Sequence, residues 1–208
     1  MKTATLAALA GLSLMLAACA PKPTPAIDGA TPPQSASSGE SPALIPDAST
    51  SKPWYADRLE TLGFFVFPEP VALPPFTLPG YPSGSVDSSK LAGKVTLLNF
   101  WATWCPPCKQ EMPSIEALWK KMRGEAFDIV AISVQESRKT VETFMKEYPY
   151  TFPIYLDESG AVSGMFVSQG IPTTFILDKT GMVIAGTVGG RSYDGPELVA
   201  FFKELAAK

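Results

Sequence analysis

The chain has 208 residues, a formal net charge of −3 and no histidine, and 46% of its residues are hydrophobic. This length and composition fit one globular domain with a sizeable core and some additional chain, but not two full domains. The mild acidity, without a basic stripe, excludes the electrostatic pattern of a nucleic-acid-binding protein. The lack of histidine excludes Ser–His and Cys–His catalysis, histidine-ligated zinc and the usual haem ligands.

Residues 1–18 have the pattern of a secretory signal peptide, because Lys2 is followed by a charge-free run of small and apolar residues. The run is shorter than the about 20 apolar residues that a transmembrane helix needs. It ends in Leu16-Ala17-Ala18-Cys19, which resembles the bacterial lipobox, whose cysteine becomes a lipidated N-terminus. We therefore predict a lipid anchor on Cys19 that holds the protein to a bacterial membrane, facing the periplasm or extracytoplasmic space. The alternatives are an ordinary signal peptide that contains a cysteine, or an uncleaved anchor.

Two segments separate this leader from the main domain. Residues 19–53 are rich in Pro, Ser, Thr and Ala, and such a segment cannot bury enough apolar surface to offset its ordering entropy. We predict a flexible tether there, with a spacer of untuned length as the alternative. Residues 54–72 contain the aromatic run FFVF at 64–67. We expect this bridging segment to pack on the domain as an added strand or helix; a partner-docking site is the alternative.

From residue 73 onwards, short apolar runs alternate with amphipathic stretches, which predicts an α/β domain over residues 73–208. Strands are expected at 94–101, 127–134, 152–156, 173–177 and 182–188, the last two forming a hairpin. Helices are expected at 106–122, 139–147, 160–166 and 196–206.

Cys105 and Cys108 form a Cys-x-x-Cys motif where the predicted strand 94–101 meets the predicted helix 106–122. A zinc site would need two more soft ligands, which the sequence lacks, and a structural disulfide would restrain only a very small loop. At a helix start, the helix dipole and free N–H groups stabilise a thiolate. We therefore predict redox chemistry, in which Cys105 attacks as the thiolate and Cys108 resolves the mixed disulfide.

Three motifs in order carry a family resemblance: LNFWATWCPPC at 98–108, KQEMP at 109–113 and GIPTT at 170–174. On these motifs, the stretch from about Pro75 to Lys208 resembles the TlpA/ResA/DsbE-type branch of the thioredoxin superfamily. The resemblance implies a thioredoxin-like α/β fold, with a central mixed sheet flanked by helices and an inserted strand–helix element at about 130–156. It also implies a thiol–disulfide oxidoreductase that needs neither a cofactor nor a metal.

The resemblance assigns a role to Glu111, which lies three residues after Cys108 and therefore on the same face of the helix. In this branch, a glutamate near the thiols transfers protons, with a pKa raised by partial burial. Thioredoxins proper use a buried aspartate on the preceding strand, a position that is Asn99 here and cannot titrate. The alternative for Glu111 is an exposed helix carboxylate.

The resemblance also implies a substrate-binding edge. Pro172 matches a proline that is cis in the family, whereas an isolated proline would be expected to be trans. The backbone of Ile171 would then bind extended substrate through main-chain hydrogen bonds, which allows a broad range of substrates. Trp104 is expected to form an exposed wall of the site, and Trp101 to lie in the core.

Pro106 and Pro107 lack backbone N–H groups. If Cys105 caps the helix, only the N–H groups of Cys108 and Lys109 remain to stabilise its sulfur. We therefore hypothesise weaker thiolate stabilisation than in strongly oxidising relatives, and a more reducing couple.

The leading functional prediction is a reductase of disulfides in exported proteins, with apocytochrome c as the family's best-known substrate. A transmembrane thiol electron donor of the CcdA/DsbD type would keep it reduced. One alternative is a peroxidase of the peroxiredoxin type, but Thr103-Trp104-Cys105 is one residue short of the Thr-x-x-Cys pattern of that family. Another is a non-catalytic module that binds cysteine-containing or metal-loaded proteins.

Overall fold

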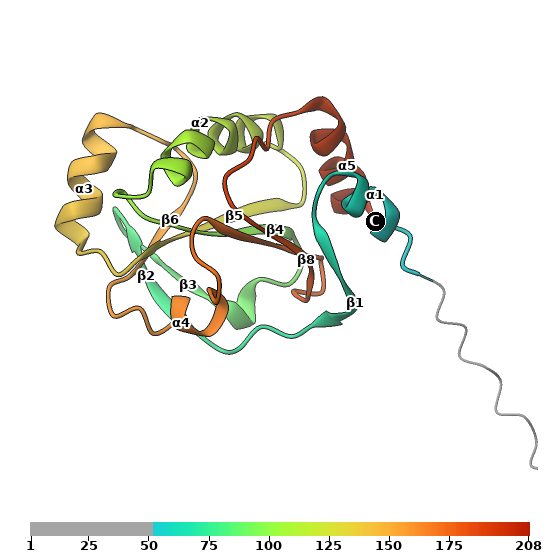
Figure 1. The fold of residues 1–208 in the computed structure, drawn as a ribbon, viewed down its shortest axis with the longest axis horizontal. Coiled ribbons are helices and arrows are strands. Elements are labelled where there is room, and N and C mark those ends of the chain that lie inside the picture. Colours follow the sequence, from blue (N-terminus) through green and yellow to red (C-terminus); the bar gives the residue numbers. More distant parts are fainter. Residues whose placement is uncertain (1–51) are drawn as a thin grey trace, which may run out of the picture. The chain divides into compact units, whose positions relative to one another are not determined.

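The computed structural model describes residues 52–208. The predicted signal peptide 1–18, Cys19 and nearly all of the predicted tether 19–53 lie outside the described residues. Within residues 52–208, helices surround one central sheet (Figure 1). None of the helices in this part of the chain has the length and apolar character needed to cross a bilayer.

Eight strands form a mixed sheet in the order β1-β8-β7-β4-β5-β6-β2-β3. Their bounds are β1 Phe65–Val71, β2 Thr77–Tyr81, β3 Ser85–Asp87, β4 Val95–Trp101, β5 Phe127–Val134, β6 Ile154–Asp157, β7 Thr173–Leu177 and β8 Val183–Val188. The central strands β4, β5 and β6 run parallel, and all the other neighbours pair antiparallel. The fold is therefore the thioredoxin-like α/β arrangement that the resemblance implied.

The helices are α1 Ala56–Thr61, α2 Pro106–Lys121, α3 Arg138–Glu147, α4 Ser163–Phe166 and α5 Pro196–Ala207, with a 3-10 turn, η1, at Ser88–Lys90. Every element that the sequence predicts between residues 94 and 206 is present, with small shifts at its ends. Helix α3 and strand β6 form the strand–helix element expected at about 130–156, and β6 lies between β5 and β2 in the sheet.

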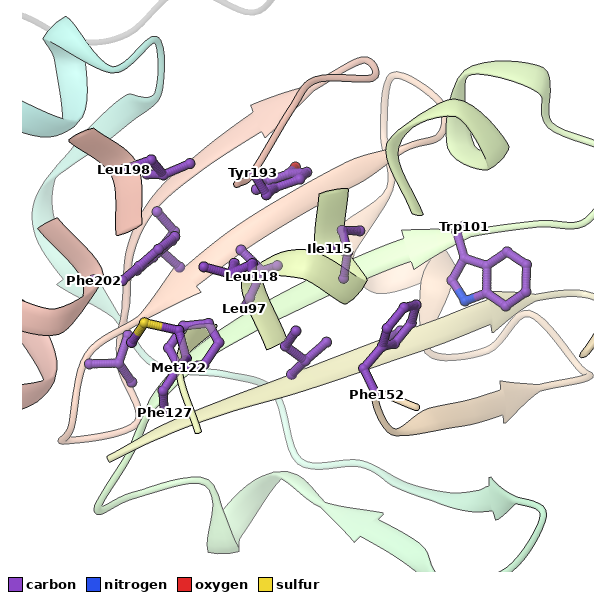
Figure 2. Close-up of a cluster of buried hydrophobic side chains, with 14 of the residues drawn as sticks. Leu97, Trp101, Ile115, Leu118, Met122, Phe127, Phe152, Tyr193, Leu198 and Phe202 are labelled. Carbon is purple, nitrogen blue, oxygen red and sulfur yellow. The ribbon is translucent and has the colours of Figure 1, made fainter. Parts of the chain in front are cut away.

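Strand β4 is buried along its whole length because apolar layers cover both faces of the sheet. Successive side chains point to opposite faces, so Leu97 and Trp101 belong to the core beneath α2, α3 and α5 (Figure 2). Leu98 and Phe100 belong to the second core, which α4 and residues of β2 and β3 cover. By the same alternation, Asn99 faces α2, and this places an amide beside the redox helix.

The bridging segment contributes both a helix and a strand. Strand β1 pairs with β8, with Phe65 opposite Gly186, and Leu59 of α1 is fully buried in the core. Arg58 forms an ion pair with Glu204 of α5. The aromatic run at 64–67 therefore extends the sheet by one edge strand.

Candidate active site

The Cys105–Cys108 pair lies at the start of α2 and is joined by a disulfide, so the structure shows the oxidised form. The helix begins here because Pro106 and Pro107 occupy its first two positions, where a missing N–H leaves no helical bond unmade. The N–H of Cys108 donates to Cys105 Sγ at 3.3 Å, whereas the N–H of Lys109 donates to the Cys105 carbonyl at 3.1 Å. One backbone donor therefore reaches the sulfur, fewer than the two that the sequence allowed.

The edge beside Cys105 has the geometry that the resemblance implied. The Ile171–Pro172 peptide bond is cis, and the carbonyl oxygen of Ile171 lies 3.7 Å from Cys105 Sγ. Trp104 is 65% exposed, while Cys105 retains 3% exposure and Cys108 none. Cys105 is thus the sulfur nearer the surface, and an incoming disulfide meets it before it meets Cys108.

Glu111 is buried, with 2% exposure, which rules out the alternative of an exposed helix carboxylate. Asn99 Nδ2 donates to Oε1 at 2.8 Å, and the backbone N–H of Arg191 donates to Oε2 at 3.3 Å. Burial raises the pKa of Glu111 to about 7, outweighing the opposing effect of these hydrogen bonds. A buried carboxyl with a pKa near neutrality, one helical turn from the buried Cys108, suits proton transfer once the disulfide is reduced.

A buried hydrogen-bond chain extends from Glu111 into the sheet. Asn99 Nδ2 also contacts Thr174 Oγ1 at 2.9 Å, and the hydroxyl of Tyr193 lies 2.7 Å from the same oxygen. Burial raises the pKa of Tyr193 well above its ordinary range, so this hydroxyl stays protonated at neutral pH. The chain fixes the Asn99 amide and therefore the direction of its donor toward Glu111.

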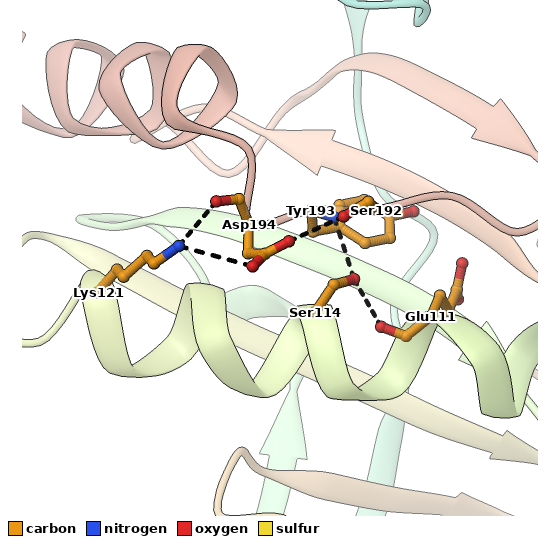
Figure 3. Close-up of polar contacts among 6 residues, drawn as sticks. All are labelled: Glu111, Ser114, Lys121, Ser192, Tyr193 and Asp194. Atoms are coloured by element: carbon orange, nitrogen blue, oxygen red, sulfur yellow. Dashed lines mark hydrogen bonds and ion pairs between the residues drawn. The ribbon is translucent and has the colours of Figure 1, made fainter.

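The segment after β8 is tied to α2 by polar contacts (Figure 3). Ser114 Oγ donates to the carbonyl of Glu111 at 2.7 Å and accepts from the backbone N–H of Tyr193 at 3.0 Å. Farther along the helix, Lys121 Nζ donates to the carbonyl of Asp194 at 2.8 Å. These contacts hold the segment that supplies the N–H of residue 191 to Glu111.

Arg191 links the bridging segment to the same site. Its guanidinium lies 4.0 Å from the ring centroid of Phe64 and donates to the carbonyls of Leu62 and Gly63. The backbone N–H of Arg191 donates to Glu111. By binding the Arg191 side chain, residues 62–64 therefore help to position this donor. The sequence gives no sign of this role for Arg191, since its partners lie far away in the chain.

A second buried carboxyl, Glu136, was also missed. It follows β5, is 5% exposed, and accepts from the N–H of Thr103 at 2.9 Å and from the hydroxyl of Ser133 at 2.8 Å. The Thr103 hydroxyl donates to it as well. Since Thr103 lies two residues before Cys105, Glu136 holds the loop that presents the redox pair. The available signal was an acid directly after a buried strand that is parallel to β4.

Comparison with known proteins shows the family to which the chain belongs. Residues 71–185 match the model of the AhpC/TSA family. The chain is 32% identical over 131 residues to the thiol-disulfide oxidoreductase ResA of a Bacillus cereus strain, covering 61% of this chain and 76% of that protein. The chain belongs to the TlpA/ResA/DsbE-type thiol–disulfide oxidoreductases, within the AhpC/TSA family.

Further relatives of this type agree. ResA of Bacillus subtilis (strain 168) is 37% identical over 116 residues, which cover 56% of this chain and 65% of that protein. A crystal structure of a thiol:disulfide interchange protein from Chlorobium tepidum TLS superposes with a TM-score of 0.54 at 30% identity, over 67% of this chain and 95% of that one. The prediction of an oxidoreductase is thus confirmed over that of a non-catalytic binding module, and disulfide-bearing proteins are the implied substrates.

Proposed function

We propose that this protein is an exported reductase of disulfides in other exported proteins, with apocytochrome c as a candidate substrate. One arrangement carries the proposal. Cys105 lies at the start of α2, against the Ile171 carbonyl, and Cys108 lies fully buried behind it. The outer sulfur suits attack and the inner sulfur suits resolution.

The proposed reaction has two exchange steps. First, the Cys105 thiolate attacks one sulfur of the substrate disulfide; that bond breaks, a mixed disulfide forms, and the other substrate sulfur leaves as a thiolate that takes up a proton. Second, the Cys108 thiolate attacks the sulfur of Cys105. The Cys105–Cys108 disulfide forms, the remaining substrate sulfur leaves as a thiolate and is protonated, and two electrons have passed to the substrate.

Glu111 is the proposed acceptor of the Cys108 proton. A buried thiol needs a nearby base, because burial disfavours its charged form. The pKa of about 7 keeps a substantial fraction of Glu111 ionised at neutral pH, while its protonated form can return the proton when the disulfide is reduced again. The same carboxyl therefore serves both directions of the cycle.

Attachment to the membrane and the electron supply complete the proposal. The sequence 16–19 supports a lipid on Cys19, and the tether 19–53 would let the domain reach both its substrates and a transmembrane thiol donor of the CcdA/DsbD type. In a bacterial host, Cys19→Ser should lose fatty-acid labelling and leave the membrane fraction. Labelling that persists in this variant would contradict the anchor.

Activity and direction are tested separately. The reduced protein should accelerate insulin reduction, and Cys105→Ser should abolish this activity. The reductase proposal also predicts a midpoint potential more negative than about −200 mV, whereas a value near about −120 mV, typical of a strong oxidant, would contradict it. Equal insulin reduction by wild type and Cys105→Ser would contradict the role of Cys105.

A further inference from the structure

An uncharged groove of about 550 Å³ lies beside the segment that leads into Pro172. Four phenylalanines from two strands and a helix line it: Phe65 and Phe67 of β1, Phe166 of α4 and Phe175 of β7. All nine lining residues are uncharged. The bridging segment supplies two of the four rings, so β1 forms part of the groove wall.

The rings of the groove pack on one another and on the core. Phe65 meets Phe67 edge to face, with centroids 5.4 Å apart, and Phe166 stacks on Phe100 at 5.3 Å. At Gly186, a Cβ would lie 2.6 Å from Phe65 and 2.9 Å from Phe175, so only glycine lets both rings lie over β8. Phe65 nevertheless remains 47% exposed, which leaves apolar surface open to a ligand.

The groove is lined by residues that flank the Ile171–Pro172 bond in the chain. Ser168 and Gln169 line it on one side of the Ile171–Pro172 bond, and Thr173 lines it on the other. The carbonyl oxygen of Ile171 lies 3.7 Å from Cys105 Sγ. A polypeptide extended along residues 168–171 advances about 3.3 Å per residue, so a side chain a few positions from its attacked cysteine can reach the groove.

We propose that this groove binds an apolar side chain of the disulfide-bearing substrate polypeptide and thereby sets a preference for apolar residues near the attacked cysteine. The proposal rests on the proposed function. A second depression is lined by Thr103 and Lys109, which lie next to the redox pair in the chain. Lys139 and Glu147 also line this depression, so it is charged. The contrast assigns the apolar part of the substrate to the phenylalanine groove.

Three pairs of synthetic peptides test the preference on the unaltered protein. The two members of each pair carry the same intramolecular disulfide and differ in one residue, Phe or Ser, which is placed two, three or four positions from the cysteine. At one of these positions, the Phe peptide should be reduced with a kcat/KM about tenfold higher, as expected when an apolar side chain fills a hydrophobic pocket. Equal kcat/KM values at all three positions would overturn the proposal.

Variants then locate the preference. Val188 lines the groove and is 43% exposed, so Val188→Lys places a charge at the groove without disturbing the core. It should remove most of the tenfold preference while leaving the Ser peptide and glutathione disulfide unaffected. Phe65→Ala should act in the same direction if Val188→Lys folds poorly. Lys139→Ser, in the charged depression, is the matched control and should keep the preference.

The outcomes separate this inference from the proposed function. If neither the peptides nor glutathione disulfide is reduced, the proposed function fails. If all are reduced but Val188→Lys and Phe65→Ala preserve the preference of the wild type, the groove assignment fails alone. Loss of the preference in Lys139→Ser with its retention in Val188→Lys would assign the site to the charged depression and would also overturn the proposal.

Discussion

Two buried carboxyls of the active site, Glu136 and Glu111, differ in how they are held. Glu136 accepts hydrogen bonds from the N–H and hydroxyl of Thr103 and from the hydroxyl of Ser133. Glu111 accepts two hydrogen bonds, one of them long at 3.3 Å. Glu136 is thus bonded to the loop before Cys105, while Glu111 lies on the same helix as Cys108.

This difference shows how burial serves two purposes in one site. The three donors on Glu136 anchor a loop, because removing the carboxylate would leave buried donors without partners. The donors on Glu111 are too few to offset its desolvation, and its pKa therefore rises to about 7. Glu136 holds the loop before Cys105, and Glu111 is the carboxyl that we propose exchanges protons.

The largest predicted effect concerns Glu111→Gln and pH. Burial places the folded-state pKa, about 7, above the ordinary value of 4.5. Below about pH 4.5 the carboxyl is protonated in both the folded and the unfolded protein. As the pH rises toward 7, the carboxyl ionises in the unfolded protein first, and the folded protein therefore loses stability. Relative to wild type, the variant should therefore gain roughly 3 kcal/mol in free energy of unfolding between pH 4 and pH 8. Urea denaturation of both oxidised proteins measures this, and a pH-independent difference would contradict the buried carboxyl.

Glu136→Ala should cost about 2 kcal/mol of stability, since it leaves the Thr103 N–H and the Ser133 hydroxyl buried without their acceptor. It should also lower kcat more than it raises KM, because the loop that presents Cys105 is released. Glu136→Gln keeps an acceptor of the same size and should recover most of both losses. A kcat equal to that of wild type in Glu136→Ala would contradict the positioning role.

Asn99→Leu tests the donor to Glu111. The hydrogen bond from Asn99 lowers the pKa of Glu111, so its loss should move that pKa above about 7, by roughly one unit. The pH–rate profile of disulfide exchange should shift to higher pH by the same amount. Tyr193→Phe is the matched control, because its hydroxyl reaches Thr174 rather than Glu111 and should shift the profile less. An unshifted profile in Asn99→Leu would remove Glu111 from the rate-controlling proton transfer.

The smallest predicted effect comes from the two prolines. Pro107→Ala adds a backbone N–H at the second helical position, from which a capping side chain commonly accepts a hydrogen bond. The reduced Cys105 should then alkylate a few-fold faster at pH 6 than it does in wild type. Pro106→Ala adds its N–H at the first position, outside the usual reach of the cap, and should change the rate less. Equal rates in all three proteins would contradict the explanation based on missing donors.

Local features made much of this site predictable from the sequence. The start of α2 follows from two prolines and a cysteine cap within four residues, and the buried pattern of β4 marks the strand before it. Glu111 and Pro172 came from the resemblance, which carries tertiary information that spacing alone lacks.

The parts that could not be predicted depend on contacts between distant residues. Glu136 meets Thr103 across 33 residues, and Thr174 meets Asn99 across 75, so these pairs exist only once the sheet register is set. The pairing of β1 with β8 likewise joins segments more than 110 residues apart and brings Phe65 and Phe67 to the phenylalanine groove. Neither composition nor periodicity specifies which partner such side chains find.

Capture of a reaction intermediate tests the central claim, that Cys105 attacks and Cys108 resolves. The reduced Cys108→Ser variant is mixed with a disulfide-bearing protein, and the reaction is quenched with acid. After proteolysis without reductant, mass spectrometry identifies the cysteine that carries the mixed disulfide. We expect a stable mixed disulfide on Cys105 in this variant, and none on Cys108 in the matched Cys105→Ser variant. A mixed disulfide that forms on Cys108 in Cys105→Ser, with none on Cys105 in Cys108→Ser, would contradict it.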